Sequence, residues 1–350
     1  MTTNIAKLEQ LLELVPLSAS RFITKYYPLA PVGARGTFGG TLVAQSLLAS
    51  LNTVPRNFIP TSLHCYFISS GNPKEMIEYD VESLRQGQNF IHKKINAYQF
   101  DKLIFSSMVL FSKDKTQETI KDRESSDNVE YHKSVHSSPE DKTKFKPAGE
   151  LFKQDIMDNG ANLKKFQRLK SRFEDMGYLK EVHNSFETQC LDYRFPLDIF
   201  KTERKTNSKL LEYFVRVRKE SITTITEPNE KTKELKESKS LITPSNDPRY
   251  NYVTFAYLSD SYLLLTLPYF HGLPMYSHTF SVSLDHTIYF HNLPKANSWL
   301  RLQLHNNRSM SDRHLIQCEH YDVTTGQIVA SVSQEGLVAY PPVSQIKARL

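Results

Sequence analysis

Apolar and polar residues alternate along two blocks of the sequence in the way that is typical of β-strands, and each block also has one apolar stretch of helical length. In the first block a loop enters a helix within 36–50, and the strand candidates are 63–68, 77–84, 90–99 and 103–111. In the second block the helix is expected at 250–265, and the strand candidates are 279–291, 299–305, 314–322 and 327–340. Each block therefore predicts one long helix packed on an antiparallel sheet, which is an α+β arrangement.

Polar segments separate these blocks. Residues 113 to about 149 are rich in Lys, Glu, Asp and Ser, which predicts a solvated linker, and 150–185 predicts one or two helices. A second polar stretch near 226–248 predicts a long surface loop. The expected organisation is an N-terminal domain at 1–112, a polar linker with a helical segment at 113–185, a C-terminal domain at 186–345 and a tail at 346–350.

The two blocks also resemble each other. When they are superposed on their strand patterns, with Pro73 opposite Pro294, the helix residue Gln45 falls opposite Asp260. The same superposition places Ser62 opposite Ser283, and Leu110 opposite Gln334. This repetition predicts a tandem double hotdog, in which each half is a long helix wrapped by an antiparallel sheet.

Composition narrows the class of protein. The 350 residues include 44 Lys and Arg against 38 Asp and Glu, and the resulting charge of +6 is too thin and scattered to indicate nucleic-acid binding. Cys65, Cys190 and Cys318 lie far apart with no CxxC pair, which excludes a disulfide scaffold and a zinc ribbon and favours a reducing compartment. No apolar run reaches about 18 residues, so no membrane span is expected.

The two ends of the chain carry weaker signals. At the N-terminus, the leucines from Leu8 to Leu14 predict a short amphipathic helix that ends before Pro16 rather than a secretory signal. The last three residues, Ala348, Arg349 and Leu350, are a conservative variant of the Ser-Lys-Leu peroxisomal address. The alternative is an ordinary basic tail.

Seven short motifs resemble, in order and spacing, those of the acyl-CoA thioesterase II family. They are GTFGG (36–40), SLHCYF (62–67), GNP (71–73), YLSDS (257–261), SLDH (283–286), YFH (289–291) and SVSQEG (331–336). The resemblance covers most of the chain outside the polar insertions. It implies a tandem double hotdog that hydrolyses fatty acyl-CoA to a free fatty acid and CoA without a metal or redox cofactor. It also strengthens the peroxisomal reading of the tail, with the peroxisomal matrix as location and the import receptor as partner.

The resemblance further implies that Asp260, Ser283 and Gln334 activate a water molecule. Hydrolysis of a thioester requires a water that is held and deprotonated next to the carbonyl group. Asp260 is the expected general base, and its burial would raise its pKa into a useful range. Ser283 and Gln334 are neutral groups that orient the same water. Without the resemblance, Asp260 reads as a helix cap or surface residue, and the other two read as ordinary strand residues.

The first block lacks this set, because Gln45 cannot act as a base. We expect that block to contribute Gly39 and Gly40, whose N–H groups at a helix start suit an oxyanion. The alternative is that these glycines only allow tight packing of the helix. His64 is a further candidate for lining the cleft, although a core or supporting role is the simpler reading.

A metal site is not expected. His286 and His291 would face opposite sides of one strand, which is poor geometry for a shared metal, so both are interpreted as structural histidines. Two other functions compete with thioester hydrolysis: hydration of an enoyl-CoA on the same fold, and acyl-CoA binding without turnover. The GxSxG motif of α/β-hydrolases is absent. Self-association is implied by the resemblance alone, and the Lys and Arg side chains that meet the CoA phosphates are not assignable from the sequence.

Overall fold

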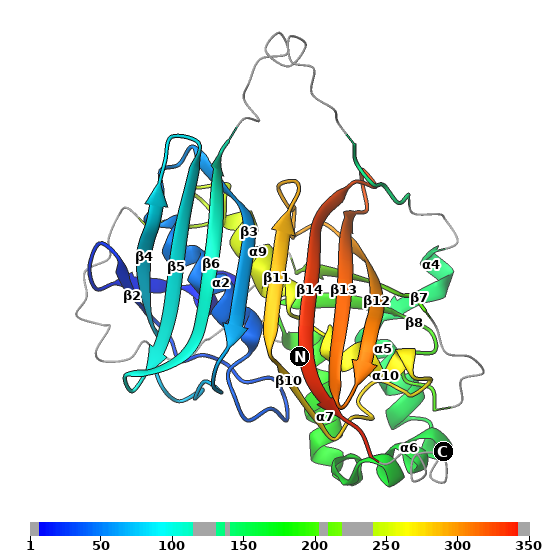
Figure 1. The fold of residues 1–350 in the computed structure, drawn as a ribbon. Helices are drawn as coiled ribbons and strands as arrows, with labels where there is room; N and C mark the ends of the chain where they lie inside the picture. Colours follow the sequence, from blue (N-terminus) through cyan, green and yellow to red (C-terminus); the bar gives the residue numbers. More distant parts are fainter. Residues whose placement is uncertain (1–6, 115–130, 137–140, 203–208, 219–240, 342–350) are drawn as a thin grey trace.

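The computed structural model describes residues 7–114, 131–136, 141–202, 209–218 and 241–341. These residues form one 14-stranded sheet in which two halves lie side by side (Figure 1). The strand order is β1-β2-β4-β5-β6-β3-β11-β14-β13-β12-β9-β8-β7, and β10 also pairs with β14. All of the strand pairs are antiparallel, as the alternating pattern of the sequence predicts.

The first half wraps its strands around helix α2 (Gly39–Leu51). All residues of this helix from Gly40 to Leu51 are buried, so the helix is enclosed on every side. A short helix, α1 (Leu8–Leu12), packs against it. The strands of this half are β1 (Leu14–Pro16), β2 (Arg21–Thr24), β3 (Phe58–Phe67), β4 (Glu78–Gln86), β5 (Phe90–Gln99) and β6 (Lys102–Lys113).

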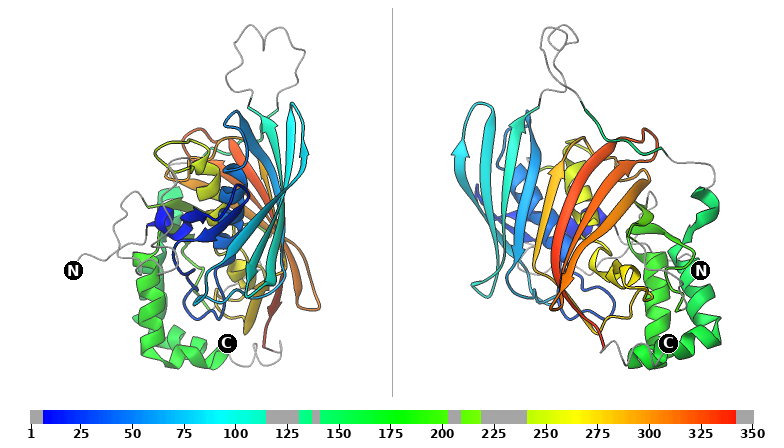
Figure 2. Two further views of the ribbon diagram at one scale, coloured as in Figure 1. Left: turned by 90° about the vertical axis from the view of Figure 1, so that its left-hand side faces the viewer. Right: turned by 45° about the vertical axis from the view of Figure 1, so that its right-hand side comes forward.

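A helical segment connects the halves and covers the same side of the sheet as α2 (Figure 2). It contains more elements than the one or two helices that the sequence predicts, because short turns of different pitch link them. They are α4 (Asp141–Lys144), β7 (Phe145–Pro147), α5 (Ala148–Phe152), the π-helix η1 (Lys153–Met157), α6 (Gly160–Leu169), the 3₁₀ turn η2 (Ser171–Glu174) and α7 (Met176–Thr188). Of the linker predicted at 113–149, residues 115–130 and 137–140 lie outside the described residues, whereas 141–149 form α4, β7 and the start of α5. Of the insertion predicted at 226–248, residues 226–240 lie outside the described residues.

The second half repeats the plan around helix α9 (Tyr250–Ser259). The 3₁₀ turn η3 (Leu264–Thr266) and α10 (Leu267–Phe270) follow it. The strands are β8 (Leu191–Pro196), β9 (Leu211–Val217), β10 (Phe280–Ser283), β11 (Asp285–Phe290), β12 (Leu300–Met310), β13 (Arg313–Asp322) and β14 (Ile328–Ala339). A turn after Asp322 joins β13 to β14, and Gly326 adopts φ +73° there.

Two of the contacts between the halves position the start of α2 and the end of α9. Strand β3 pairs with β11, so that the sheet continues from one half into the other. Behind the sheet α2 packs on α9, where the backbones approach so closely that a Cβ on Gly40 would lie 2.4 Å from the carbonyl oxygen of Tyr257. Phe38 and Tyr257 meet edge to face beside this contact. The helix contact and the shared sheet bring the start of α2 next to the end of α9.

Two predicted elements are shorter than the sequence pattern suggests. The helix expected at 250–265 ends at Ser259, because Tyr262 adopts φ +63° and turns the chain. Tyr262 is held in this conformation by stacking on Phe186 and by a 3.2 Å hydrogen bond between its hydroxyl and that of Tyr276. The strand expected at 279–291 is divided into β10 and β11.

Candidate active site

The sequence pattern predicts Asp260 in the middle of a helix, but the structure places it at the C-terminal end of α9. Its side chain is 9% exposed. One carboxylate oxygen, Oδ1, accepts a 2.6 Å hydrogen bond from Nε2 of Gln334. The backbone N–H of Gly40, in the first turn of α2, also donates to the carboxylate. The ends of both long helices therefore converge on this one acidic group.

Gln334 connects Asp260 to Ser283. Its Nε2 donates to Asp260 and also, over 2.8 Å, to Oγ of Ser283. Gln334 is fully buried in β14, whereas Ser283 ends β10 and is partly exposed. Ser283 pairs across the sheet with Gly336, so it is a diagonal neighbour of Gln334 on the same face. The structure thus brings the three residues named from the sequence into one hydrogen-bonded group, called the trio below.

A β-bulge sets the position of Ser283. The partners Ser283–Gly336 and Thr287–Ser333 are four residues apart on the β10–β11 side but only three apart on β14. The extra residue separates β10 from β11 and locally changes the direction of the strand. This bulge explains why the strand predicted at 279–291 is interrupted beside the trio.

The hydrogen bonds of the trio leave specific groups available to a ligand. Because Ser283 Oγ accepts from Gln334, its own proton can be donated elsewhere. Oε1 of Gln334 is buried and has no hydrogen-bond partner among the described residues. The trio therefore offers a carboxylate and an amide oxygen as acceptors and one hydroxyl as a donor. Such a set can hold a water molecule and receive one of its protons.

Burial controls the charge of Asp260. Loss of solvation raises the pKa of this carboxyl from 3.8 to about 7, while the hydrogen bonds from Gln334 and Gly40 act in the opposite direction. The N-terminal dipole of α2 also favours the charged form, whereas the C-terminal end of α9 disfavours it. At neutral pH the carboxyl is therefore poised between its two protonation states, as general-base catalysis requires.

Gly39 and Gly40 both lie against the trio. A Cβ at Gly39 would lie 2.6 Å from Oδ2 of Asp260 and 2.8 Å from the ring of Phe67, so the close approach of α2 needs a glycine here. The structure thus gives these glycines a packing role, and the N–H of Gly40 already bonds the carboxylate. The expected contact of their N–H groups with a substrate oxyanion stays a prediction.

His64 is not brought to the trio. It is exposed on β3, where it pairs with Thr287 and contacts the ring of Tyr289. The next residue, Cys65, is buried; burial raises the pKa of its thiol, and the nearby carboxylate of Asp260 raises it further. Because successive residues of a strand point to opposite faces, His64 faces away from the site.

His286 supports the trio in a way that the sequence does not reveal. Its Nε2 lies 2.9 Å from Oγ of Ser259, the residue before Asp260. Because Ser259 donates its own proton to the carbonyl of Ala256, His286 must donate from Nε2. Complete burial lowers the pKa of His286 to about 3. No sequence signal identifies this contact, because it depends on how β11 packs against α9.

The other expected histidine roles agree with the strand geometry. His286 is fully buried while His291 is exposed and bonds Ser331 over 2.8 Å, so the two face opposite sides as predicted. Within the described ranges no group of three His, Cys, Asp or Glu side chains has the arrangement of a metal site. Over the same part of the chain, no helix is long and apolar enough to cross a membrane.

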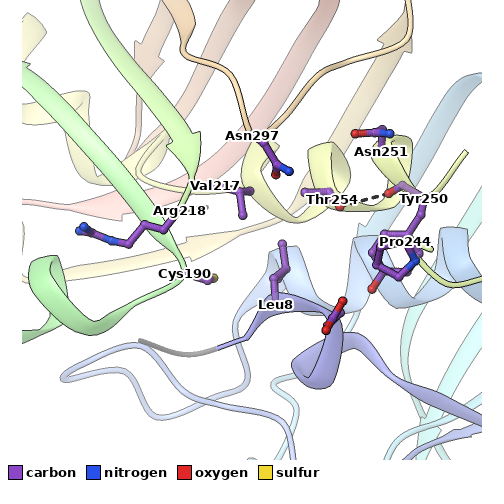
Figure 3. Close-up of a pocket in the computed structure, with 10 residues that line it drawn as sticks. Leu8, Cys190, Val217, Arg218, Pro244, Tyr250, Asn251, Thr254 and Asn297 are labelled. Atoms are coloured by element: carbon purple, nitrogen blue, oxygen red, sulfur yellow. Dashed lines mark hydrogen bonds between the residues drawn. The ribbon is translucent and has the colours of Figure 1, made fainter. Parts of the chain in front are cut away.

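A separate cavity of about 240 Å³ lies toward the other end of α9 (Figure 3). Leu8, Arg218, Tyr250 and Asn297 are among its lining residues, and none of the trio is. Cys190, which also lines it, shares a hydrogen bond with Tyr257 one turn before Asp260. The cavity and the trio are therefore distinct places on one helix.

Comparison with known proteins gives consistent matches. A family model described as "Acyl-CoA thioesterase" matches residues 205–337, and one described as "Acyl-CoA thioesterase N-terminal domain" matches residues 28–112. The chain is 49% identical to peroxisomal acyl-coenzyme A thioester hydrolase 1 of Saccharomyces cerevisiae over 99% of this chain and 98% of that protein. It is 24% identical to acyl-CoA thioesterase 2 of Haemophilus influenzae over 88% and 90% of the two chains.

Solved structures agree on the fold. An acyl-CoA thioesterase II from Mycobacterium marinum has a TM-score of 0.61 at 21% identity and covers 95% of this chain and 97% of its own. A protein with a hot dog fold from Alicyclobacillus acidocaldarius has a TM-score of 0.58 at 12% identity and covers 95% of this chain and 98% of its own. The expected tandem double hotdog fold is confirmed.

Proposed function

The chain belongs to the acyl-CoA thioesterase family, and we propose from that premise how its residues hydrolyse the thioester of an acyl-CoA. The observation that carries the proposal is the bonding of one Gln334 amide to both Asp260 and Ser283 in a buried site. The substrate is a fatty acyl-CoA, and the products are the free fatty acid and CoA.

In the proposed mechanism Asp260 is the general base. A water molecule donates one hydrogen bond to its carboxylate and another to Oε1 of Gln334, an atom that has no partner among the described residues. The oxygen of that water forms a bond with the thioester carbon while its proton passes to Asp260. The C–S bond of the resulting tetrahedral intermediate then breaks, and the proton on Asp260 passes to the departing CoA sulfur.

We propose that Ser283 binds the reacting oxygen atoms. Its hydroxyl accepts from Gln334, so that its proton is directed to the water or to the thioester carbonyl. Gly39 and Gly40 remain proposed oxyanion donors. Since the N–H of Gly40 bonds Asp260, a thioester oxygen would share that donor with the carboxylate. An unchanged turnover in folded Gly40→Pro would remove the oxyanion role.

Measurement of free thiol released from a saturated acyl-CoA tests the proposal. Asp260→Asn keeps the shape of the side chain and removes its basic oxygen, and we expect a loss of at least about 10³-fold in kcat. Gln334→Ala is expected to lose less, since the carboxylate is retained. An Asn variant as fast as the parent protein would refute the mechanism. Parallel assays with an enoyl-CoA distinguish hydrolysis from hydration.

The cellular location follows from the same premise. We infer a peroxisomal location, in the matrix, and this inference is supported by the name of the yeast relative and by the terminal residues Ala348, Arg349 and Leu350. Those three residues lie outside the described part of the chain. The import receptor that reads such an address is the expected partner. Deletion of the three residues in a fluorescently tagged protein should leave it in the cytosol.

The chain is expected to divide into domains, to act without a cofactor and to self-associate. We propose the domain division 1–112, 113–185, 186–345 and 346–350, which agrees with a strand order that places β1 to β6 together. The proposed mechanism needs no metal or redox cofactor, because water, a carboxylate and two neutral side chains account for every bond that forms or breaks. Further self-association of the chain is a proposal that size-exclusion chromatography with light scattering would test.

A further inference from the structure

Two basic residues lie between α6 and α7: Lys170 directly follows α6, and Arg172 is in η2. Nζ of Lys170 donates to the backbone carbonyl of His278 over 3.2 Å. Nη1 of Arg172 donates to the carbonyl of Gly33 over 2.7 Å, and its guanidinium lies 5.5 Å from the ring centre of Tyr178. Both cations therefore contact neutral groups, and they connect the helical segment to loops from both halves of the molecule.

In the described part of the chain, no carboxylate forms an ion pair with either of these cations. Lys170 is partly buried, and its burial together with the nearby charge of Arg172 lowers its pKa to about 8. Arg172 is exposed, whereas the charge of Lys170 is partly desolvated and lies near a like charge, which is unfavourable unless an anion joins them.

Unpartnered polar atoms lie on the loop that Lys170 contacts. Oγ of Ser277 and Nδ1 of His278 are buried without a hydrogen-bond partner among the described residues. Ser277 is 1% exposed and His278 is 6% exposed. Buried polar groups normally have partners, so these atoms are a second sign, independent of the charges, that this place accommodates a polar ligand.

The distance of this place from the trio is limited by the chain. His278 precedes Ser283 by five residues, which span at most roughly 17 Å, and Gly33 precedes Gly39 by six residues, which span at most roughly 21 Å. Figure 1 shows β10 and the α6–α7 region at the same end of the molecule. The arm of CoA between its sulfur and its first phosphate has about 13 bonds, as many as four to five extended residues, and spans roughly 15 Å.

We propose that Lys170 and Arg172 bind phosphate groups of the CoA nucleotide while the thioester lies at the trio. The inference rests on the proposed function, which places the thioester at Asp260. Phosphate is the anion that suits the site, because a guanidinium and an ammonium group donate charge-assisted hydrogen bonds to its oxygens. The described loop carbonyls keep the two cations in place before the substrate arrives.

The test compares two substrates with the same acyl group, an acyl-CoA and an acyl-pantetheine that lacks all phosphates. The double variant Lys170→Gln, Arg172→Gln removes both charges but keeps amide donors for the two loop carbonyls. We expect its KM for acyl-CoA to rise on the order of tenfold to a hundredfold with little change in kcat. Its kcat/KM for acyl-pantetheine should stay within about twofold of the parent value.

Lys164→Gln is the matched control, because Lys164 is an exposed lysine of the preceding helix α6. It should leave both KM values unchanged if the effect belongs to the site and not to net charge. Equal losses of kcat/KM on both substrates in the double variant would assign Lys170 and Arg172 a structural role and overturn the proposal. An unchanged KM for acyl-CoA would overturn it as well.

Inhibition distinguishes the CoA nucleotide from a free anion. Adenosine 3′,5′-bisphosphate should compete with acyl-CoA in the parent and lose potency in the double variant. If inorganic phosphate inhibits the double variant less than the parent while the KM for acyl-CoA stays the same, the site binds a free anion and the proposal is wrong. Failure of the proposed mechanism would look different, since an active Asp260→Asn variant contradicts the catalytic role whatever the two substrates show.

Discussion

The burial of Asp260 predicts that its catalytic charge destabilises the fold. Asp260→Asn removes this charge but keeps the size of the side chain and an oxygen that can accept from Gln334. The pKa of this carboxyl rises from 3.8 to about 7 on folding. Its ionisation therefore lowers the free energy of unfolding progressively as pH increases between those two values. The penalty is absent below pH 3.8 and complete above pH 7.

The size of the effect follows from the same pKa values. With 1.36 kcal/mol for each pKa unit, the ionisation of Asp260 costs the folded state about 1.5 kcal/mol at pH 5 and about 4 kcal/mol at pH 8. The pH-independent effects of the substitution cancel when the two conditions are compared. The stability of Asp260→Asn relative to the parent should therefore increase by about 2.5 kcal/mol from pH 5 to pH 8.

Urea unfolding of both proteins at the two pH values measures this change. Asp101→Asn is a suitable control, since Asp101 is an exposed residue of the β5–β6 turn with φ +58°, a conformation that Asn tolerates. Its stability relative to the parent should not depend on pH in this range. If the Asp260→Asn difference were equally independent of pH, the carboxyl would ionise normally and the reasoning from burial would be refuted.

Three further substitutions test the neighbours of the carboxylate. Ser283→Thr should retain kcat within a few-fold because it keeps the hydroxyl, whereas Ser283→Ala should lose on the order of tenfold to a hundredfold in kcat. Equal rates for the two variants in thiol-release assays would exclude a role for the hydroxyl. Gly39→Ala should reduce kcat/KM by at least about tenfold, since its Cβ would lie 2.6 Å from Oδ2 of Asp260, while Gly160→Ala, with no atom within 4 Å of the added Cβ, should have no effect on activity. His286→Leu should lower kcat and leave KM unchanged because it removes the donor that positions the end of α9, and His286→Gln should restore part of the rate; equal rates for the Leu and Gln variants would contradict that positioning role.

The strands were predictable where one face of the sheet is buried. In β5 the buried and partly exposed residues alternate from Ile91 to Gln99, and the strand predicted at 90–99 has the observed bounds. Helix α9 was less predictable. Its apolar pattern continues past Ser259, but Tyr262 ends the helix through contacts with residues distant in the sequence, such as Phe186 and Tyr276.

The candidate site shows the same limit. Family resemblance identified Asp260 and Gln334, but they are 74 positions apart, and their contact depends on how α9 and β14 pack. The bulge that positions Ser283 gives no signal in a sequence of alternating residues. His64 was a candidate because of its motif, yet the alternation of β3 places it on the exposed face. Contacts between elements therefore decide which of the motif residues can share a site.

In the proposed mechanism, Asp260 must be ionised to take a proton from water. The pH dependence of kcat/KM for a saturated acyl-CoA tests this directly, because that parameter reports the ionisation of the free enzyme. We expect kcat/KM to fall about tenfold per pH unit below an apparent pKa near 7, the value to which burial raises the pKa of Asp260. A profile that stays flat down to pH 5 in a protein that remains folded would contradict it.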